Sequence, residues 1–139
     1  MNEGGGAPGD DRADGGDPFQ YAVLRVVPRV ERGESLNAGV ILLCRPRRYL
    51  AARVGLDAGR LRALAPDVDP ATIEAHLALV VRIAAGEAGA GPIARLSIGE
   101  RFHFLVSPSS TVIQPSEVHT GLCDDPAEEL DHLFDRLVR

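Results

Sequence analysis

The sequence predicts an α+β domain: a mostly antiparallel sheet, helices packed on one face, and an amphipathic helix at the C-terminus. Three observations predict this class. Three apolar or β-branched segments follow one another closely in the first half, as in antiparallel hairpins. Two longer segments with helical periodicity occupy the second half. The 139 residues, 45% of them hydrophobic, suffice for one core, and no apolar run approaches the roughly 20 residues that a membrane helix needs.

We expect residues 1–18 to form a disordered acidic tail and residues 19–139 to form a single domain. The tail is mostly glycine, aspartate and proline, without apolar periodicity. Such a segment cannot bury enough apolar surface to offset the entropy lost on ordering. It lacks the basic and then apolar layout of a signal peptide, so we expect a cytoplasmic protein with no membrane partner.

Three strands are predicted in the first half of the chain. Residues 19–27 are rich in β-branched and aromatic side chains. Residues 40–44 are five apolar residues without a turn former, which predicts a strand buried on both faces. A tight turn follows around Pro46, and residues 49–54 form the next strand. Together these segments predict a three-stranded antiparallel meander.

Three helix starts are predicted by an acidic N-cap residue ahead of an apolar stripe. Asp57 precedes a short helix that ends before Pro66, and Asp69 and Asp125 are each followed by a proline at the first helical position. The last helix carries one apolar stripe, formed by Leu130, Leu133, Phe134 and Leu137. This segment is the predicted amphipathic helix.

The segment ahead of the last helix is predicted to contain further strands. Residues 101–106 alternate at period two, with both phenylalanines on one side, which predicts a half-buried strand. Residues 111–114 are expected to form another short strand, and residues 115–123 an irregular segment.

The formal net charge of −5 is distributed unevenly along the chain. Residues 25–62 carry nine arginines against three acids, whereas residues 63–139 carry five arginines against twelve acids. This asymmetry indicates an anion-binding or protein-binding face, unless the charges intermix on folding. The lack of a recognised reader motif and the 4% aromatic content do not favour nucleic-acid binding.

The loop at residues 33–39 holds the first candidate binding residues, Glu34 and Asn37. It feeds directly into the buried strand, and loops held by a rigid strand often carry function. A carboxylate and an amide there could orient a hydroxyl, a phosphate or a metal-bound water. Alternatively, Asn37 and Gly39 serve the backbone, because asparagine and glycine also close turns.

A second candidate set holds a cation, two hydroxyls and an imidazole: Arg101, Ser107, Ser110 and His119. A serine with a histidine base, and an arginine for an anion, are the parts of an acyl- or phosphoryl-transfer site. No nucleophile elbow or phosphate-binding loop accompanies them, and Ser-Pro-Ser-Ser is ordinary turn chemistry. We therefore assign no catalytic residue, and the sequence leaves open whether the protein is an enzyme.

No metal site and no cofactor are predicted. His119 and Cys123 form one His-x3-Cys pair without the further ligands that a structural zinc site needs. The other cysteine, Cys44, is far away in the sequence and lies within a predicted strand. Cys123 precedes the last helix, whose N-terminus could lower the thiol pKa and make it reactive.

A group of short motifs carries a resemblance to a known family. They are YAVLRVVP at residues 21–28, GE and LNAGV within residues 33–40, RF at 101–102, SPSS at 107–110 and HTG at 119–121. With these motifs, residues 19–138 resemble a family of small bacterial proteins known as domain of unknown function 3037. The resemblance implies no activity, cofactor or catalytic residue. Because the family's genes often neighbour those of HipA-like serine/threonine kinases, it implies a partner or accessory role.

Two hypotheses on function result. The first is a non-catalytic cytoplasmic partner domain that works with a HipA-like kinase through a protein–protein surface. The alternative is a small enzyme or an anionic-ligand-binding domain whose pocket joins Glu34, Asn37, Arg101 and His119. The alternative requires these groups to meet within hydrogen-bond reach or through a water.

Overall fold

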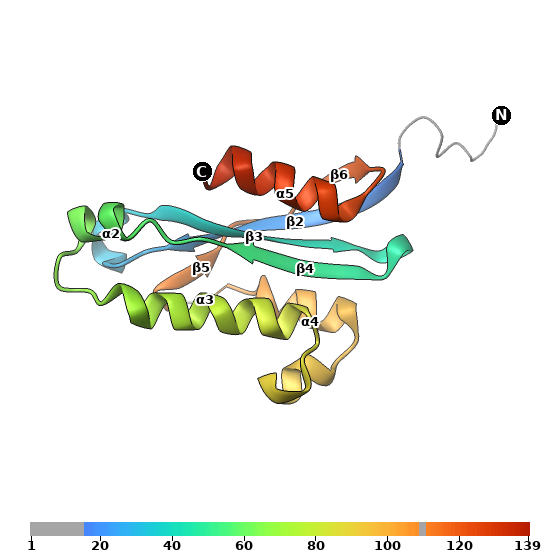
Figure 1. Cartoon of the computed structure of the whole chain (residues 1–139), viewed down its shortest axis with the longest axis horizontal. Coiled ribbons are helices and arrows are strands. Elements are labelled where there is room, and N and C mark those ends of the chain that lie inside the picture. The colour runs from blue at the N-terminus through green and yellow to red at the C-terminus, as the bar shows by residue number, and fades with distance from the viewer. Residues whose placement is uncertain (1–15, 109–110) are drawn as a thin grey trace.

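The computed structural model describes residues 16–108 and 111–139, which contain one five-stranded antiparallel sheet with helices packed against it (Figure 1). The spatial order is β4-β3-β2-β5, and β6 also pairs with β2. The strands are β2 (Asp17–Val26), β3 (Leu36–Cys44), β4 (Tyr49–Val54), β5 (Ile113–Pro115) and β6 (His119–Cys123). The predicted α+β class and its antiparallel sheet are therefore confirmed.

The predicted meander is formed by β2, β3 and β4. Both strand pairs are antiparallel, and Val23 lies opposite Val40 in the β2–β3 ladder. A short 3-10 turn, η2 (Arg45–Arg47), joins β3 to β4 and ends at Arg48 with a φ of 50°. The predicted turn around Pro46 is thus confirmed.

The other edge of β2 is shared by two short strands. β6 pairs with the N-terminal half of β2, and β5 pairs with its C-terminal half (Figure 1). The short strand predicted at residues 111–114 is confirmed as β5, which begins two residues later. The prediction of an irregular segment at 115–123 is wrong over β6, because pairing with β2 gives these residues a ladder that their own propensities do not indicate.

Three of the helices begin where an acidic N-cap predicted them. These helices are α2 (Ala58–Leu64), α3 (Pro70–Ala84) and α5 (Pro126–Leu137). A carboxylate oxygen accepts a backbone N–H in each first turn, at 3.1 Å for Asp57, 3.0 Å for Asp69 and 3.0 Å for Asp125. Each bond satisfies one of the N–H groups that a helix start leaves without a partner.

The predicted strand at residues 101–106 is wrong, because this segment lies in a helix, α4 (Ile98–Leu105). A capping box starts the helix: the Glu100 N–H donates to Ser97 Oγ, and the Ser97 N–H donates to Glu100 Oε1 at 3.2 Å. Phe102 is buried and Phe104 is exposed, so the two rings do not share a face as period two requires. In a helix, side chains two positions apart point in different directions, which explains why one ring is buried and the other is exposed.

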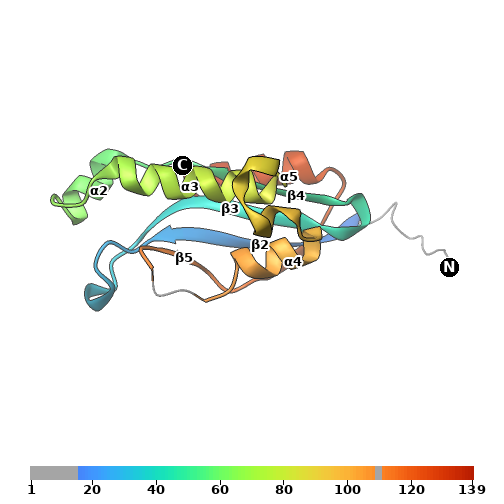
Figure 2. The ribbon, with the colours of Figure 1, turned by 90° about the horizontal axis from the view of Figure 1, so that it is seen from below.

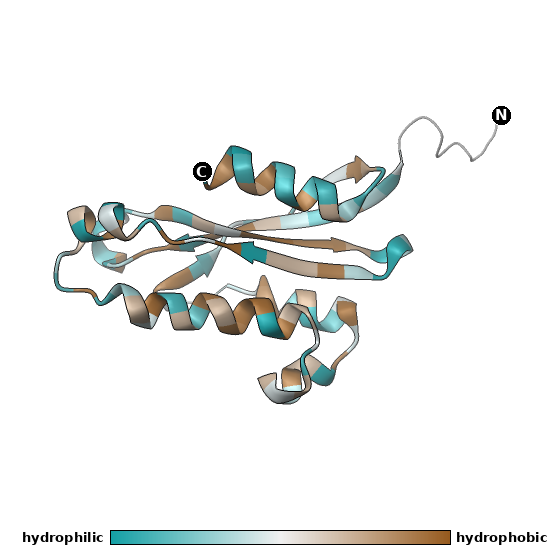
Figure 3. Ribbon diagram, viewed as in Figure 1, coloured by the Kyte–Doolittle hydropathy of each residue, from teal (hydrophilic) through white to brown (hydrophobic). Residues whose placement is uncertain are grey.

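The helices cover both faces of the sheet, and the prediction of one covered face is wrong. On one face, α5 packs on a cluster made of Phe19, Val40, Leu42, Cys44, Cys123, Leu130 and Leu133. On the other, α3 and α4 pack on Ala22, Leu24, Ile41, Leu43 and Leu50 through Ala84 and Phe102. Because β3 is apolar on both sides (Figure 3), each of its faces needs a layer of helix.

The predicted tail and domain meet inside β2. Asp17 and Pro18, which the prediction places in the tail, begin this strand, and residues 1–15 lie outside the described residues. Asp17 is only 2% exposed, and its Oδ2 accepts a hydrogen bond from Arg47 Nε at 2.6 Å. Within the part of the chain that the structure describes, no helix is long and apolar enough to cross a membrane.

Candidate functional site

The first candidate pair, Glu34 and Asn37, makes contacts that hold the fold. Glu34 forms an ion pair with Arg32, in which the Nε–Oε1 distance is 3.1 Å. The Asn37 Nδ2 group donates to the backbone carbonyl of Leu137 at 2.9 Å. The amide thereby satisfies a carbonyl that the end of α5 would otherwise leave unpaired, and fastens that end to β3.

Arg101 also bonds to backbone. Its Nη1 donates to the Leu96 carbonyl at 2.7 Å and its Nη2 donates to the Ala84 carbonyl at 3.3 Å. The guanidinium therefore joins the C-terminal end of α3 to the segment that leads into α4. Arg101 satisfies carbonyls that have no helical partner, which is a common use of a cation near a helix end.

The remaining candidates lie elsewhere in the fold. Ser107 Oγ donates to the His103 carbonyl at 2.7 Å, a local bond at the end of α4. Ser110 lies outside the described residues. His119 is exposed on β6, and its ring centroid lies 5.2 Å from that of Tyr21, on the α5 side of the sheet.

The structure does not bring the candidates into one pocket. Asn37 lies opposite Arg25, and His119 lies opposite Tyr21 on the other side of β2. Four residues of strand separate these two positions, about 13 Å at 3.3 Å per residue. Arg101 belongs to the α4 layer, across the sheet from α5. The predicted pocket of Glu34, Asn37, Arg101 and His119 is therefore wrong.

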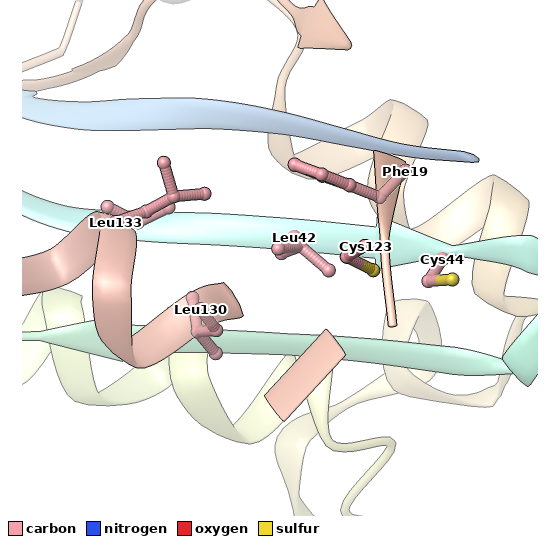
Figure 4. Close-up of a cluster of buried hydrophobic side chains, with 7 residues drawn as sticks. Phe19, Leu42, Cys44, Cys123, Leu130 and Leu133 are labelled. Carbon is pink, nitrogen blue, oxygen red and sulfur yellow. The ribbon is translucent and has the colours of Figure 1, made fainter. Parts of the chain in front are cut away.

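The two cysteines lie in the cluster under α5 (Figure 4). Cys44 ends β3 and Cys123 ends β6, and both are buried. Burial, and to a smaller extent the neighbouring Cys44 thiol, raises the pKa of Cys123 to about 11. The expectation of a pKa lowered by the helix N-terminus is wrong, because burial has the larger effect. Among the described residues, no three His, Cys, Asp or Glu side chains form a metal-binding group.

The pKa of Cys123 predicts that the free energy of unfolding falls above pH 9. The ordinary thiol pKa is 9.0 and the folded one is about 11, so the folded state binds this proton more tightly. The stabilisation is complete below pH 9 and is lost as the pH rises toward 11. Burial also raises the pKa of Tyr49, so this residue too contributes stability that is lost as the pH rises. Urea midpoints across this window should fall less in Cys123→Ala than in the wild type. An equal fall in both proteins would contradict this role of the thiol.

A mostly apolar groove lies between α3, the C-terminal end of α4 and β5. We call it the α3–β5 groove; its volume is about 490 Å³. Leu24 of the sheet lines it, together with His76, Leu79, Val80 and Ile83 of α3. Apart from His76, Ser107 and Thr111, its lining residues are apolar. The groove can therefore bury apolar groups of a ligand, and its own lining offers few polar groups for hydrogen bonds.

Two large apolar side chains at the groove are exposed to solvent. Leu79 is 40% exposed and Phe104 is 51% exposed. The sequence prediction misses both, because it places Phe104 in a strand and because Leu79 lies off the buried stripe of α3. The helical spacing of Leu79 and Ile83, with Val80 between them, is the signal that marks a second apolar stripe on α3.

The fold and its contacts define a class: an α+β domain in which Asn37, Arg101 and Ser107 bond to the domain's own backbone, and a mostly apolar groove is open to solvent. The chain belongs to the family described as protein of unknown function (DUF3037), whose model matches residues 21–138. No curated protein and no solved structure matches the chain.

Proposed function

We propose that the protein is a non-catalytic accessory domain that binds a protein partner through the α3–β5 groove. The observation that carries this proposal is the exposure of Leu79 and Phe104 beside a groove of about 490 Å³. Large apolar side chains beside a hollow are typical of binding surfaces, because a partner that covers them removes apolar area from water.

The polar candidates support a binding role over catalysis. Asn37, Arg101 and Ser107 each donate to a backbone carbonyl within the domain. A catalytic set needs a nucleophile or base held next to a second functional group, with room for a substrate. These three groups instead stabilise α5, the end of α3 and the end of α4.

The partner that we propose is a HipA-like serine/threonine kinase in the bacterial cytoplasm. The support is the gene neighbourhood that goes with the family, together with the apolar groove. A groove of this kind suits the association of two folded proteins, in which a few buried apolar side chains supply most of the binding free energy.

Co-purification from the native host tests the proposal. The full chain, tagged at one end, should recover a kinase-like protein, and the double variant Leu79→Gln and Phe104→Gln should recover at least about tenfold less. The control is Leu122→Gln, since Leu122 is 60% exposed on β6 and does not line the groove. A chain recovered alone at every salt concentration, or equal recovery by all three proteins, would contradict the proposal.

A further inference from the structure

A second hollow borders the α3–β5 groove and lies along α4. The second hollow has a volume of about 540 Å³, and Phe104 and Ser107 line both. From there it follows Leu96, Gly99 and His103 to Arg45 in the β3–β4 turn. We call the two adjoining hollows the α4 strip. In Figure 2, α4 lies on the same side of the sheet as α3, between β5 and that turn.

The α3 side of the strip is shaped to receive a helix. His76, Leu79, Val80 and Ile83 follow the spacing i, i+3, i+4 and i+7, so they form one ridge over two turns of α3. At 1.5 Å per residue the ridge is about 10 Å long. Helices pack by placing such ridges into the grooves of another helix, and helix-in-groove binding uses apolar anchors at the same spacing.

The far end of the strip carries a cation. The Arg45 guanidinium lies against Gly99, where an added Cβ would come within 2.6 Å of Nη1. In residues 16–108 and 111–139, no carboxylate pairs with Arg45, whereas Arg47 of the same turn pairs with Asp17. Glu100 is the acid that lines this hollow, and it accepts from Ser97 Oγ at 2.9 Å. Arg45 is therefore placed to pair with an acid from outside the domain.

We propose that the α4 strip binds an amphipathic helix whose apolar stripe enters the α3–β5 groove and whose carboxylate side chain pairs with Arg45. This inference rests on the proposed function and specifies the chemistry of the partner segment. Gly99 and Phe104 are five residues apart on α4, an axial separation of about 7.5 Å. In the bound helix, the acidic residue that pairs with Arg45 should therefore lie roughly four to seven residues before or after the apolar residue that contacts Phe104.

Selection from a phage-displayed library of random peptides, with the full chain as the target, tests the inference. Enriched peptides should share apolar residues at helical spacing and an Asp or Glu at the stated distance. At low salt, a synthetic copy of an enriched peptide should bind Arg45→Glu about tenfold more weakly than it binds the wild-type chain. This difference in affinity should shrink as salt is added. Selection against Arg45→Glu should enrich Lys or Arg at the same position.

Arg48→Glu is the matched control, since Arg48 lies in the same turn but does not line the strip. Acidic peptides that bind equally to Arg45→Glu and Arg48→Glu would overturn the pairing. Enriched peptides without an acid would overturn it as well, while leaving the groove and the proposed function intact. Peptides that bind unchanged to Phe104→Gln would instead count against the groove. A chain that forms dimers sensitive to Phe104→Gln would assign the strip to a second copy and overturn the inference.

Discussion

Replacing Leu42 with alanine should lower the free energy of unfolding by about 2–5 kcal/mol. Leu42 is fully buried in the middle of β3, within the cluster that α5 covers. The substitution loses the burial of the side chain and leaves a cavity between the sheet and α5, which surrounding residues fill only in part. A domain of this size is stabilised by about 5–15 kcal/mol, so the change is a large part of the total.

Urea unfolding measures this effect as a lower midpoint with an unchanged slope. Leu79→Ala is the matched control, because it removes the same atoms from an exposed site on α3 and should change stability by less than about 1 kcal/mol. Similar losses in the two variants would contradict the burial of β3 beneath α5.

Replacing Gly39 with alanine should destabilise the protein by about 1–3 kcal/mol. Gly39 lies in β3 opposite Val54 and next to Leu24 of β2. A Cβ would lie 2.9 Å from Val54 Cγ1 and 3.0 Å from the Arg53 carbonyl oxygen. Since one of these atoms is backbone, the strands must shift to accept the methyl group.

Replacing Gly59 with alanine should instead raise the free energy of unfolding. Gly59 lies in α2, where the nearest atom to an added Cβ is Asp57 Oδ1 at 3.4 Å. Alanine restricts the unfolded chain and favours helix, so this variant should gain up to about 1 kcal/mol. Thermal unfolding of both variants separates the two effects, and a Gly39→Ala protein as stable as Gly59→Ala would contradict the close strand contact.

Elements with strong local signals could be predicted from the sequence. The run at 40–44 has no turn former, and Asp57, Asp69 and Asp125 each cap a helix with their own side chain. These signals act over a few residues and do not depend on the rest of the fold. They therefore identified the meander and three helices, with boundaries within a few residues.

Elements that depend on distant partners could not be predicted in the same way. β6 is the five residues HTGLC, whose strand conformation depends on β2. The period-two pattern at 101–106 is short enough to fit a strand or a helix. The capping box of Ser97 and Glu100 favours the helix, and both residues lie before the segment 101–106.

The candidate site shows the same limit. Residue type singled out Asn37 and Arg101 as candidate binding residues, but the partners of their side chains include the domain's own backbone carbonyls of Leu137 and Ala84. The α3–β5 groove joins β2, α3, α4 and β5, which are far apart in the chain. Only the folded arrangement brings Leu79 and Phe104 to one groove, so the helical pattern on α3 alone could not identify the surface.

The position of β2 has a consequence for folding during synthesis. Among the described strands β2 comes first in the chain, yet one of its edges is completed only by β5 and β6, which come much later. The Val23 N–H, for example, bonds to Ser116 Oγ, 93 positions later. Closing such long loops slows folding, and an unpaired strand edge can pair with another nascent chain. During synthesis, β2 therefore has an unpaired edge until β5 and β6 have been translated.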